Sequence, residues 1–275
     1  MTGLPASGQR ERTAEGLVLE RDTQCPGLMT LTIDRQDDLN RLTPEVMIRL
    51  GRIATALADD TSTDVLLITG SGTENFSMGI LNPAIRASYS KEEIVEIVMR
   101  SNRVFDAIEA LPQIVIVAIN GKVLAGAVEL CLACDLRYAS QGATMTMPEA
   151  TWGGFPGAGA PVRLPMIVGR ARAIELICTG RTITADEMSS LGLVQGLYAP
   201  DALMSGVLTI ARKIASSGPL AVRGAKRISA ERQEPGFHAA RILSDQLRRE
   251  LEWSQDVDEG MAAHKENRKP RFVGR

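Results

Sequence analysis

The sequence predicts an α/β protein that ends in a helical region. Short apolar runs alternate with amphipathic helical patterns up to about residue 200, and only helical patterns follow. Alternation of buried strands with helices is typical of parallel sheets joined by right-handed crossovers. The 275 residues are enough for one to two domains with a substantial core.

The first structured part is expected to be strands. Residues 16–22 (GLVLERD) and 27–35 (GLMTLTIDR) partly alternate apolar and polar residues, and the turn-prone segment 24–27 separates them. A helix should begin at Pro44, because Thr43 can cap it and proline suits the first helical position.

Two continuous apolar runs predict strands that are buried on both faces. They are residues 64–72 (DVLLITGSG) and 113–121 (QIVIVAING), and each ends in a turn that contains glycine. Between them, residues 91–111 carry the apolar stripe of a helix. Further along, Thr184 and Glu187 have the spacing of a capping box, which predicts another short helix.

Three helical patterns without strands occupy the C-terminal part, at residues 203–217, 220–232 and 236–255. The predicted organisation is therefore a loose N-terminal segment (1–15), a mixed α/β domain (16–202) and a helical region (203–275). The region from Arg223 onward is mildly basic, which indicates a solvated helical face.

Composition excludes several classes of protein. The formal net charge is −2, so the total charge does not favour nucleic acid as a partner. No apolar stretch is long enough for a membrane span, and the polar start does not resemble a secretion signal. Reduced thiols suit the cytoplasm, which is the predicted location.

Cys131 and Cys134 have the spacing of a redox or zinc pair. No second pair exists, and the two histidines, His238 and His264, lie far away in sequence. Both cysteines fall in an apolar helical stretch, so buried structural thiols are predicted and no metal site is expected.

The segment NGKVLAGAVELCLACD (120–135) places one acid in an apolar helical stretch. A helix that begins near Gly126 would present free backbone N–H groups, and Glu129 would lie one turn further on. Glu149 stands among apolar residues, where desolvation should perturb its pKa. The pair could act as general acid and base. Alternatively, Glu129 pairs with a nearby arginine such as Arg137, and Glu149 is a helix-end or surface acid.

Three segments together resemble the enoyl-CoA hydratase/isomerase family, the crotonase superfamily. They are residues 120–135, the stretch that begins at MPEATWGGFPGAGAP (147–161), and the turn FSMGIL (76–81). The ending EGMAAHKENRKPRF (259–272) is also similar, so the resemblance covers roughly residues 15–273. Within the triple-glycine segment of the family, only Gly126 is retained here, between two alanines.

The resemblance implies a crotonase-like spiral of β-β-α turns with a C-terminal helical trimerisation region, and a homotrimer or homohexamer. It implies an acyl-CoA thioester as ligand, with coenzyme A as part of the substrate and no separate cofactor. The backbone amides of Ile80 and Gly126 would form an oxyanion hole, whose donors are each worth about 3 kcal/mol in other enzymes. Glu129 would deprotonate water, and Glu149 would protonate the α-carbon.

The resemblance also places substrate-binding residues. Met78, Asn82, Leu124 and Trp152 would line the acyl pocket, although apolar residues at such positions are often plain core. Arg41 lies near the expected position of the CoA adenine, where it would pair with a phosphate or face solvent.

The presence of both acids favours hydration of a 2-enoyl-CoA to a 3-hydroxyacyl-CoA. Two alternatives remain open at this point. One is an isomerase, thioester hydrolase or decarboxylase of the same superfamily, and the other is a non-catalytic acyl-CoA-binding protein. Buried carboxyl groups argue against a pure binding protein, because burial of such groups is costly without a function.

Overall fold

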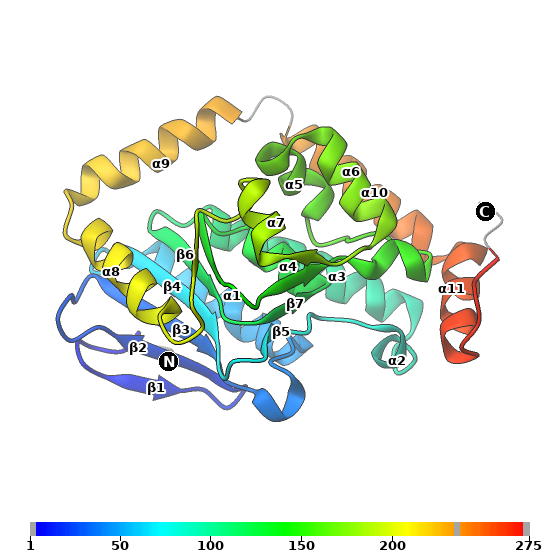
Figure 1. The fold of residues 1–275 in the computed structure, drawn as a ribbon, viewed down its shortest axis with the longest axis horizontal. Helices are drawn as coiled ribbons and strands as arrows, with labels where there is room; N and C mark the ends of the chain where they lie inside the picture. Colours follow the sequence, from blue (N-terminus) through cyan, green and yellow to red (C-terminus); the bar gives the residue numbers. More distant parts are fainter. Residues whose placement is uncertain (1–3, 234–236, 272–275) are drawn as a thin grey trace.

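Two sheets surrounded by helices make up the computed structural model, which describes residues 4–233 and 237–271 (Figure 1). The larger sheet has the strand order β1-β2-β3-β4-β6-β8-β11. Its strands are β1 (Arg10–Arg12), β2 (Leu17–Arg21), β3 (Leu28–Ile33), β4 (Val65–Gly70), β6 (Ile114–Ile119), β8 (Leu136–Ser140) and β11 (Gly196–Tyr198). The smaller sheet has the order β10-β9-β7-β5. Its strands are β5 (Asn75–Ser77), β7 (Lys122–Leu124), β9 (Thr144–Thr146) and β10 (Ile183–Thr184).

Helices follow the strands in a repeated pattern. The α-helices of the first part are α1 (Pro44–Ala58), α2 (Pro83–Arg86), α3 (Lys91–Glu109), α4 (Gly126–Leu132), α5 (Ala160–Val168), α6 (Arg170–Thr179) and α7 (Ala185–Ser190). Two 3-10 helices are η1 (Gln36–Asp38) and η2 (Pro148–Trp152). The C-terminal helices are α8 (Leu203–Ala215), α9 (Pro219–Gln233), α10 (Phe237–Glu252) and α11 (Gln255–Lys265).

The strand order confirms the predicted spiral of β-β-α turns. Strand β3 pairs in parallel with β4, β4 with β6, β6 with β8, and β8 with β11. Each of β4, β6 and β8 is followed first by a strand of the smaller sheet and then by a helix. Because β5, β7 and β9 also pair in parallel, the turns that follow β5 and β7 lie at the same edge of the smaller sheet.

The predicted two-sided burial of the central strands is confirmed. In β4, Leu66 and Ile68 belong to the main core, whereas Val65 and Leu67 belong to a second apolar cluster that includes Val207 of α8. Full burial of each such side chain contributes about 1.5–3 kcal/mol. Both faces of the sheet are therefore covered, which explains the continuous apolar runs.

The predicted helix starts are confirmed by their caps. The side chain of Thr43 accepts a hydrogen bond from the amide of Val46, and that of Thr184 accepts one from the amide of Glu187. Each cap satisfies one of the free N–H groups that a helix leaves at its start.

Residues 10–12 fall in the segment that the sequence predicts to be loose, but they form β1 and pair antiparallel with β2. The backbone of this charged stretch gains a hydrogen-bonded partner at the sheet edge. Charged side chains suit such an edge, because they oppose pairing with further strands.

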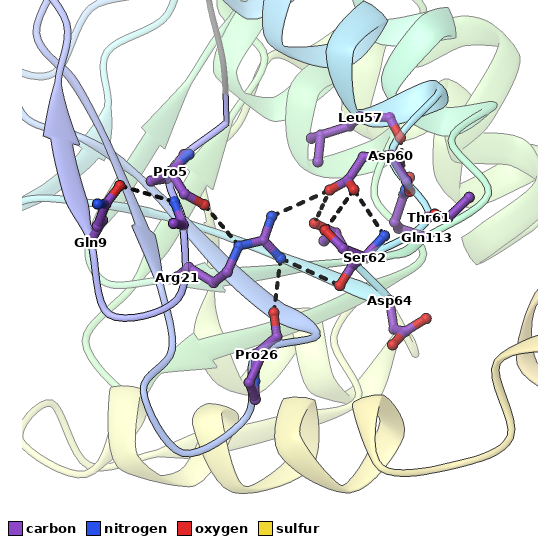
Figure 2. Close-up of polar contacts among 12 residues, drawn as sticks. Pro5, Gln9, Arg21, Pro26, Leu57, Asp60, Thr61, Ser62, Asp64 and Gln113 are labelled. Carbon is purple, nitrogen blue, oxygen red and sulfur yellow. Dashed lines mark hydrogen bonds and ion pairs between the residues drawn. The ribbon is translucent and has the colours of Figure 1, made fainter.

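Arg21 of β2 connects the N-terminal segment to the larger sheet through hydrogen bonds. Figure 2 shows that its guanidinium donates to the carbonyl oxygens of Pro5 (2.9 Å) and Pro26 (2.8 Å) and pairs with Asp60. Burial opposes ionisation of Asp60, but hydrogen bonds from Ser62 and other neighbours, Arg21 included, lower the pKa of Asp60 to about 2. The buried arginine is thus fully compensated.

The C-terminal helices return to the α/β part of the molecule. Helix α8 packs on the larger sheet, α10 contacts α3 and α5, and α11 contacts η2 and α2. Helix α9 extends along one side of the molecule (Figure 1). None of the described helices combines the length and apolarity that crossing a bilayer requires. The domain boundary at residue 203 and the trimerisation role stay predictions.

Candidate active site

Two turns at the edge of the smaller sheet bring the backbone near Gly79 and Gly126 into contact. A Cβ atom on Gly79 would lie 2.5 Å from the carbonyl oxygen of Leu124 and 3.2 Å from the nitrogen of Gly126. Gly79 also has φ +80°, a conformation that favours glycine. The parallel pairing of β5 with β7 therefore places the amides of Ile80 and Gly126 in adjacent turns.

These two amides are available for a ligand. Within the described part of the chain, neither the nitrogen of Ile80 nor that of Gly126 donates a hydrogen bond. Gly126 is the first residue of α4, as predicted, so its N–H belongs to the unpaired N-terminal turn. A Cβ on Gly126 would lie 2.5 Å from Cδ1 of Ile80, so a side chain there would collide with Ile80.

Ala125 precedes this helix in an unusual backbone conformation, with φ 52° and ψ −127°. Its amide donates to the carbonyl oxygen of Thr146 over 2.9 Å, which fixes the turn to β9. Such a conformation is favourable for glycine and costs an alanine on the order of 1–3 kcal/mol. The strain is therefore placed directly beside the Gly126 amide.

A cavity of about 50 Å³ lies beside the two turns. Among its walls are Ile80, Gly126, Glu129, Glu149 and Trp152, all of which were predicted as site residues. The other lining residues are Leu81, Arg86, Val98, Ala125, Phe155, Gly157, Ala158 and Arg248. A space of this size holds only a few water molecules.

Glu129 enters the cavity from α4 and is 2% exposed. Its Oε1 accepts a hydrogen bond of 3.0 Å from the amide of Ala160, the first residue of α5. Burial raises the pKa of Glu129 to about 7, and the Ala160 hydrogen bond and the charge of Arg163 partly oppose this increase.

The alternative ion pair of Glu129 with Arg137 is wrong. Arg137 instead donates to the carbonyl oxygens of Leu193 (2.8 Å) and Cys134 (2.5 Å). Its position on β8 directs the guanidinium to these main-chain acceptors, which leaves the Glu129 carboxylate facing the cavity.

Glu149 comes from η2, and its carboxyl group is buried although the residue as a whole is half-buried. Its Oε2 atom has no hydrogen-bond partner among the described residues. Burial and the charge of Glu129 raise the pKa of Glu149 to about 8. Burial is the main cause in both groups, so both carboxyl groups hold their protons to higher pH than a solvated glutamate does. The alternative of a surface acid is wrong.

Two cavity residues, Arg86 and Arg248, were not found from the sequence. Arg248 belongs to the basic C-terminal stretch, for which a solvated face was expected, but it is 3% exposed. Both guanidinium groups pair with Glu252, which is 1% exposed. No local pattern signals this cluster, because its members come from α2 and α10.

Four predicted binding residues do not line the cavity. Asn82 caps α2, since its Oδ1 accepts from the amide of Ile85 over 2.9 Å. Arg41 pairs with Asp38 over 2.7 Å, and its side chain is 23% exposed. Met78 and Leu124 are half-buried beside the two turns. Their roles in substrate or CoA binding stay predictions.

The two cysteines of α4 and its C-terminal end are buried, as predicted. Burial raises the pKa of Cys134 to about 12 and also raises that of Cys131. Neutral thiols are poor nucleophiles and poor metal ligands. Among the side chains that the structure describes, no group of three or more histidine, cysteine or acidic residues is arranged to hold a metal ion.

The α/β spiral, with two buried carboxyl groups beside two adjacent turns, is that of the crotonase fold. The family model described as "Enoyl-CoA hydratase/isomerase" matches residues 23–275. The chain therefore belongs to the enoyl-CoA hydratase/isomerase family.

Individual relatives agree with this assignment. The chain is 34% identical over 261 residues to a crotonyl-CoA hydratase of Syntrophomonas wolfei, with 95% of this chain and 99% of the relative covered. It is 34% identical over 244 residues to a putative enoyl-CoA hydratase/isomerase of Bacillus subtilis, with coverage of 89% and 94%. The crystal structure of an enoyl-CoA hydratase from Bacillus anthracis superposes with a TM-score of 0.76 at 34% identity, covering 94% of this chain and all of that one. The protein is thus an enoyl-CoA hydratase-like enzyme, and the predicted crotonase-like fold is confirmed.

Proposed function

We propose that the enzyme adds water to a 2-enoyl-CoA thioester and forms a 3-hydroxyacyl-CoA. One observation carries this proposal: Glu129 and Glu149 line the same cavity as Ile80 and Gly126, whose amides are free. An acid, a base and two hydrogen-bond donors are the groups that hydration through an enolate requires.

In this mechanism the thioester carbonyl oxygen accepts hydrogen bonds from the amides of Ile80 and Gly126. Negative charge develops on this oxygen when water attacks the β-carbon. The amides are fixed by two adjacent turns, so they need little reorganisation as the charge appears. Preorganised donors of this kind stabilise the transition state more than the ground state.

The two carboxyl groups divide the proton transfers between them. Glu129 takes a proton from the attacking water, whose oxygen bonds to the β-carbon. Glu149 gives its proton to the α-carbon, and the enolate electrons return to form that C–H bond. The raised pKa values of both groups support a role in proton transfer near neutral pH. Proton exchange with solvent then restores both groups for the next turnover.

The proposed reaction uses coenzyme A only as part of the substrate and requires no further cofactor. Similarity to a crotonyl-CoA hydratase of Syntrophomonas wolfei supports an unsaturated acyl-CoA as ligand. The homotrimer or homohexamer and the cytoplasmic location are further predictions for this protein.

Hydration of crotonyl-CoA by the purified protein tests the proposal. Glu129→Gln and Glu149→Gln should each lower kcat by about 100-fold or more, while binding of a saturated acyl-CoA is retained. Glu96→Gln is the matched control, because Glu96 lies on α3, pairs with Arg100 and does not line the cavity. Unimpaired hydration by Glu129→Gln would refute the assigned base. Products of double-bond migration or thioester hydrolysis would identify another reaction of the superfamily.

A further inference from the structure

Arg86 and Arg248 share a single buried carboxylate beside the acid pair. Nη2 of Arg86 donates to Oε1 of Glu252 over 2.6 Å, and Nη2 of Arg248 donates to Oε2 over the same distance. The three side chains are 11%, 4% and 1% exposed, respectively. This cluster joins α2 to α10 and carries two positive charges against one negative charge.

Both guanidinium groups have N–H donors that make no hydrogen bond with the described residues. A guanidinium has five N–H donors, but each of these arginines uses only one nitrogen in a hydrogen bond within the described structure. The Nε atoms of both are buried without a hydrogen-bond partner among the described residues. Buried donors without acceptors destabilise a protein, so an arrangement of this kind indicates a site for an acceptor.

Both arginines line the cavity that contains Glu129 and Glu149. Glu129 accepts a hydrogen bond from the amide of Ala160, and the charge of Arg248 interacts with both Glu129 and Glu149. The Nε donors of Arg86 and Arg248 have no acceptor among the described residues, so they are left to interact with a group that enters the cavity. An apolar acyl tail would leave these donors unpaired.

We infer, on the basis of the proposed hydratase function, that the enzyme prefers a 2-enoyl-CoA whose acyl group ends in a carboxylate, which Arg86 and Arg248 bind. A carboxylate provides two oxygens that match guanidinium donors.

A matched pair of substrates tests this inference. Two 2-enoyl-CoA esters of equal chain length are compared, one with a carboxylate end and one with a methyl end. We expect a higher kcat/KM for the carboxylate-ended ester with the unaltered protein. Arg86→Met should lower the ratio of the two kcat/KM values by roughly 10- to 100-fold, the effect of losing a hydrogen bond to a charged group. Arg100→Met is the control, since Arg100 pairs with Glu96 on α3 away from the cavity, and it should leave the ratio unchanged.

Calorimetric titration with the two saturated acyl-CoA esters separates this inference from the proposed reaction. Preferred binding of the carboxylate-ended ester without hydration of either enoyl ester would overturn the hydratase function and retain the charge selectivity. Hydration with equal or better use of the methyl-ended ester would overturn the inference and retain the reaction. An equal loss with both esters in Arg86→Met would also overturn it, since the arginines would then be structural. The preference of the unaltered protein decides the question even if the variant does not fold.

Discussion

Replacing Glu149 with glutamine should remove much of the pH dependence of the protein's stability. The carboxyl group has a pKa of about 8 in the folded protein because of burial and the charge of Glu129, against an ordinary value of 4.5. A group whose pKa is raised on folding contributes stability that is complete below pH 4.5 and is lost as the pH rises through about 8. Glutamine has no proton to lose, so Glu149→Gln should lack this loss.

The magnitude follows from the size of the pKa change. At about 1.4 kcal/mol per pH unit, an increase from 4.5 to about 8 corresponds to about 5 kcal/mol. Because Glu129 and Glu149 interact, the two carboxyl groups share part of this energy, and 5 kcal/mol is an upper limit for Glu149. We expect a loss of a few kcal/mol in the free energy of unfolding between pH 5 and pH 9 that is specific to Glu149.

Urea unfolding at pH 5 and pH 9 measures this loss for the unaltered protein and for Glu149→Gln. The comparison uses the difference between the two pH values, so a constant packing cost of the glutamine side chain cancels. Protein concentration is held fixed, because oligomerisation would make the apparent stability depend on it. Glu96→Gln serves as the control for loss of an exposed carboxylate. Equal pH dependence in the unaltered protein and Glu149→Gln would refute a buried, protonated Glu149.

Three further outcomes are expected. The pH profile of kcat/KM should be bell-shaped, rising through about 7 as one carboxyl group of the pair ionises and falling through about 8 as the second one does. A flat profile from pH 6 to 9 would contradict a role for the pair. Gly126→Ala should lower kcat by about 100-fold or more, because its methyl group would collide with Ile80 and displace the amide, and retained turnover in the hydration assay would exclude that role. Ala125→Gly should raise the free energy of unfolding by about 1 kcal/mol, as relief of the φ 52° strain exceeds the added chain entropy; a lower midpoint in urea would show that the strain is absent.

Elements with strong local patterns could be predicted from the sequence. Strands β4 and β6 were identified because burial on both faces requires continuous apolar runs. The starts of α1 and α7 were identified because a threonine side chain at the cap satisfies a backbone amide. Strand β1 was missed, since its pairing depends on β2 and its charged sequence has no strand pattern.

The candidate site was only partly predictable. Glu129 could be identified as a candidate because it is an acid within an apolar helix. That Glu129 and Glu149 lie in the same site was predicted only from the family resemblance. Spacing alone also allowed a pair with Arg137, which the structure excludes. Arg86 and Arg248 could not be predicted, because the packing of α10 against the α/β part brings them together, and the charge pattern of α10 is that of an ordinary solvated helix.

Isotope incorporation during turnover tests the central claim most directly. Crotonyl-CoA is incubated with the enzyme in heavy water enriched in oxygen-18, and the product is analysed by mass spectrometry and NMR. Acid–base hydration predicts one deuterium on the α-carbon and one oxygen-18 on the β-carbon in each product molecule. Deuterium on the α-carbon without oxygen on the β-carbon, or no incorporation at either position, would contradict the proposed reaction.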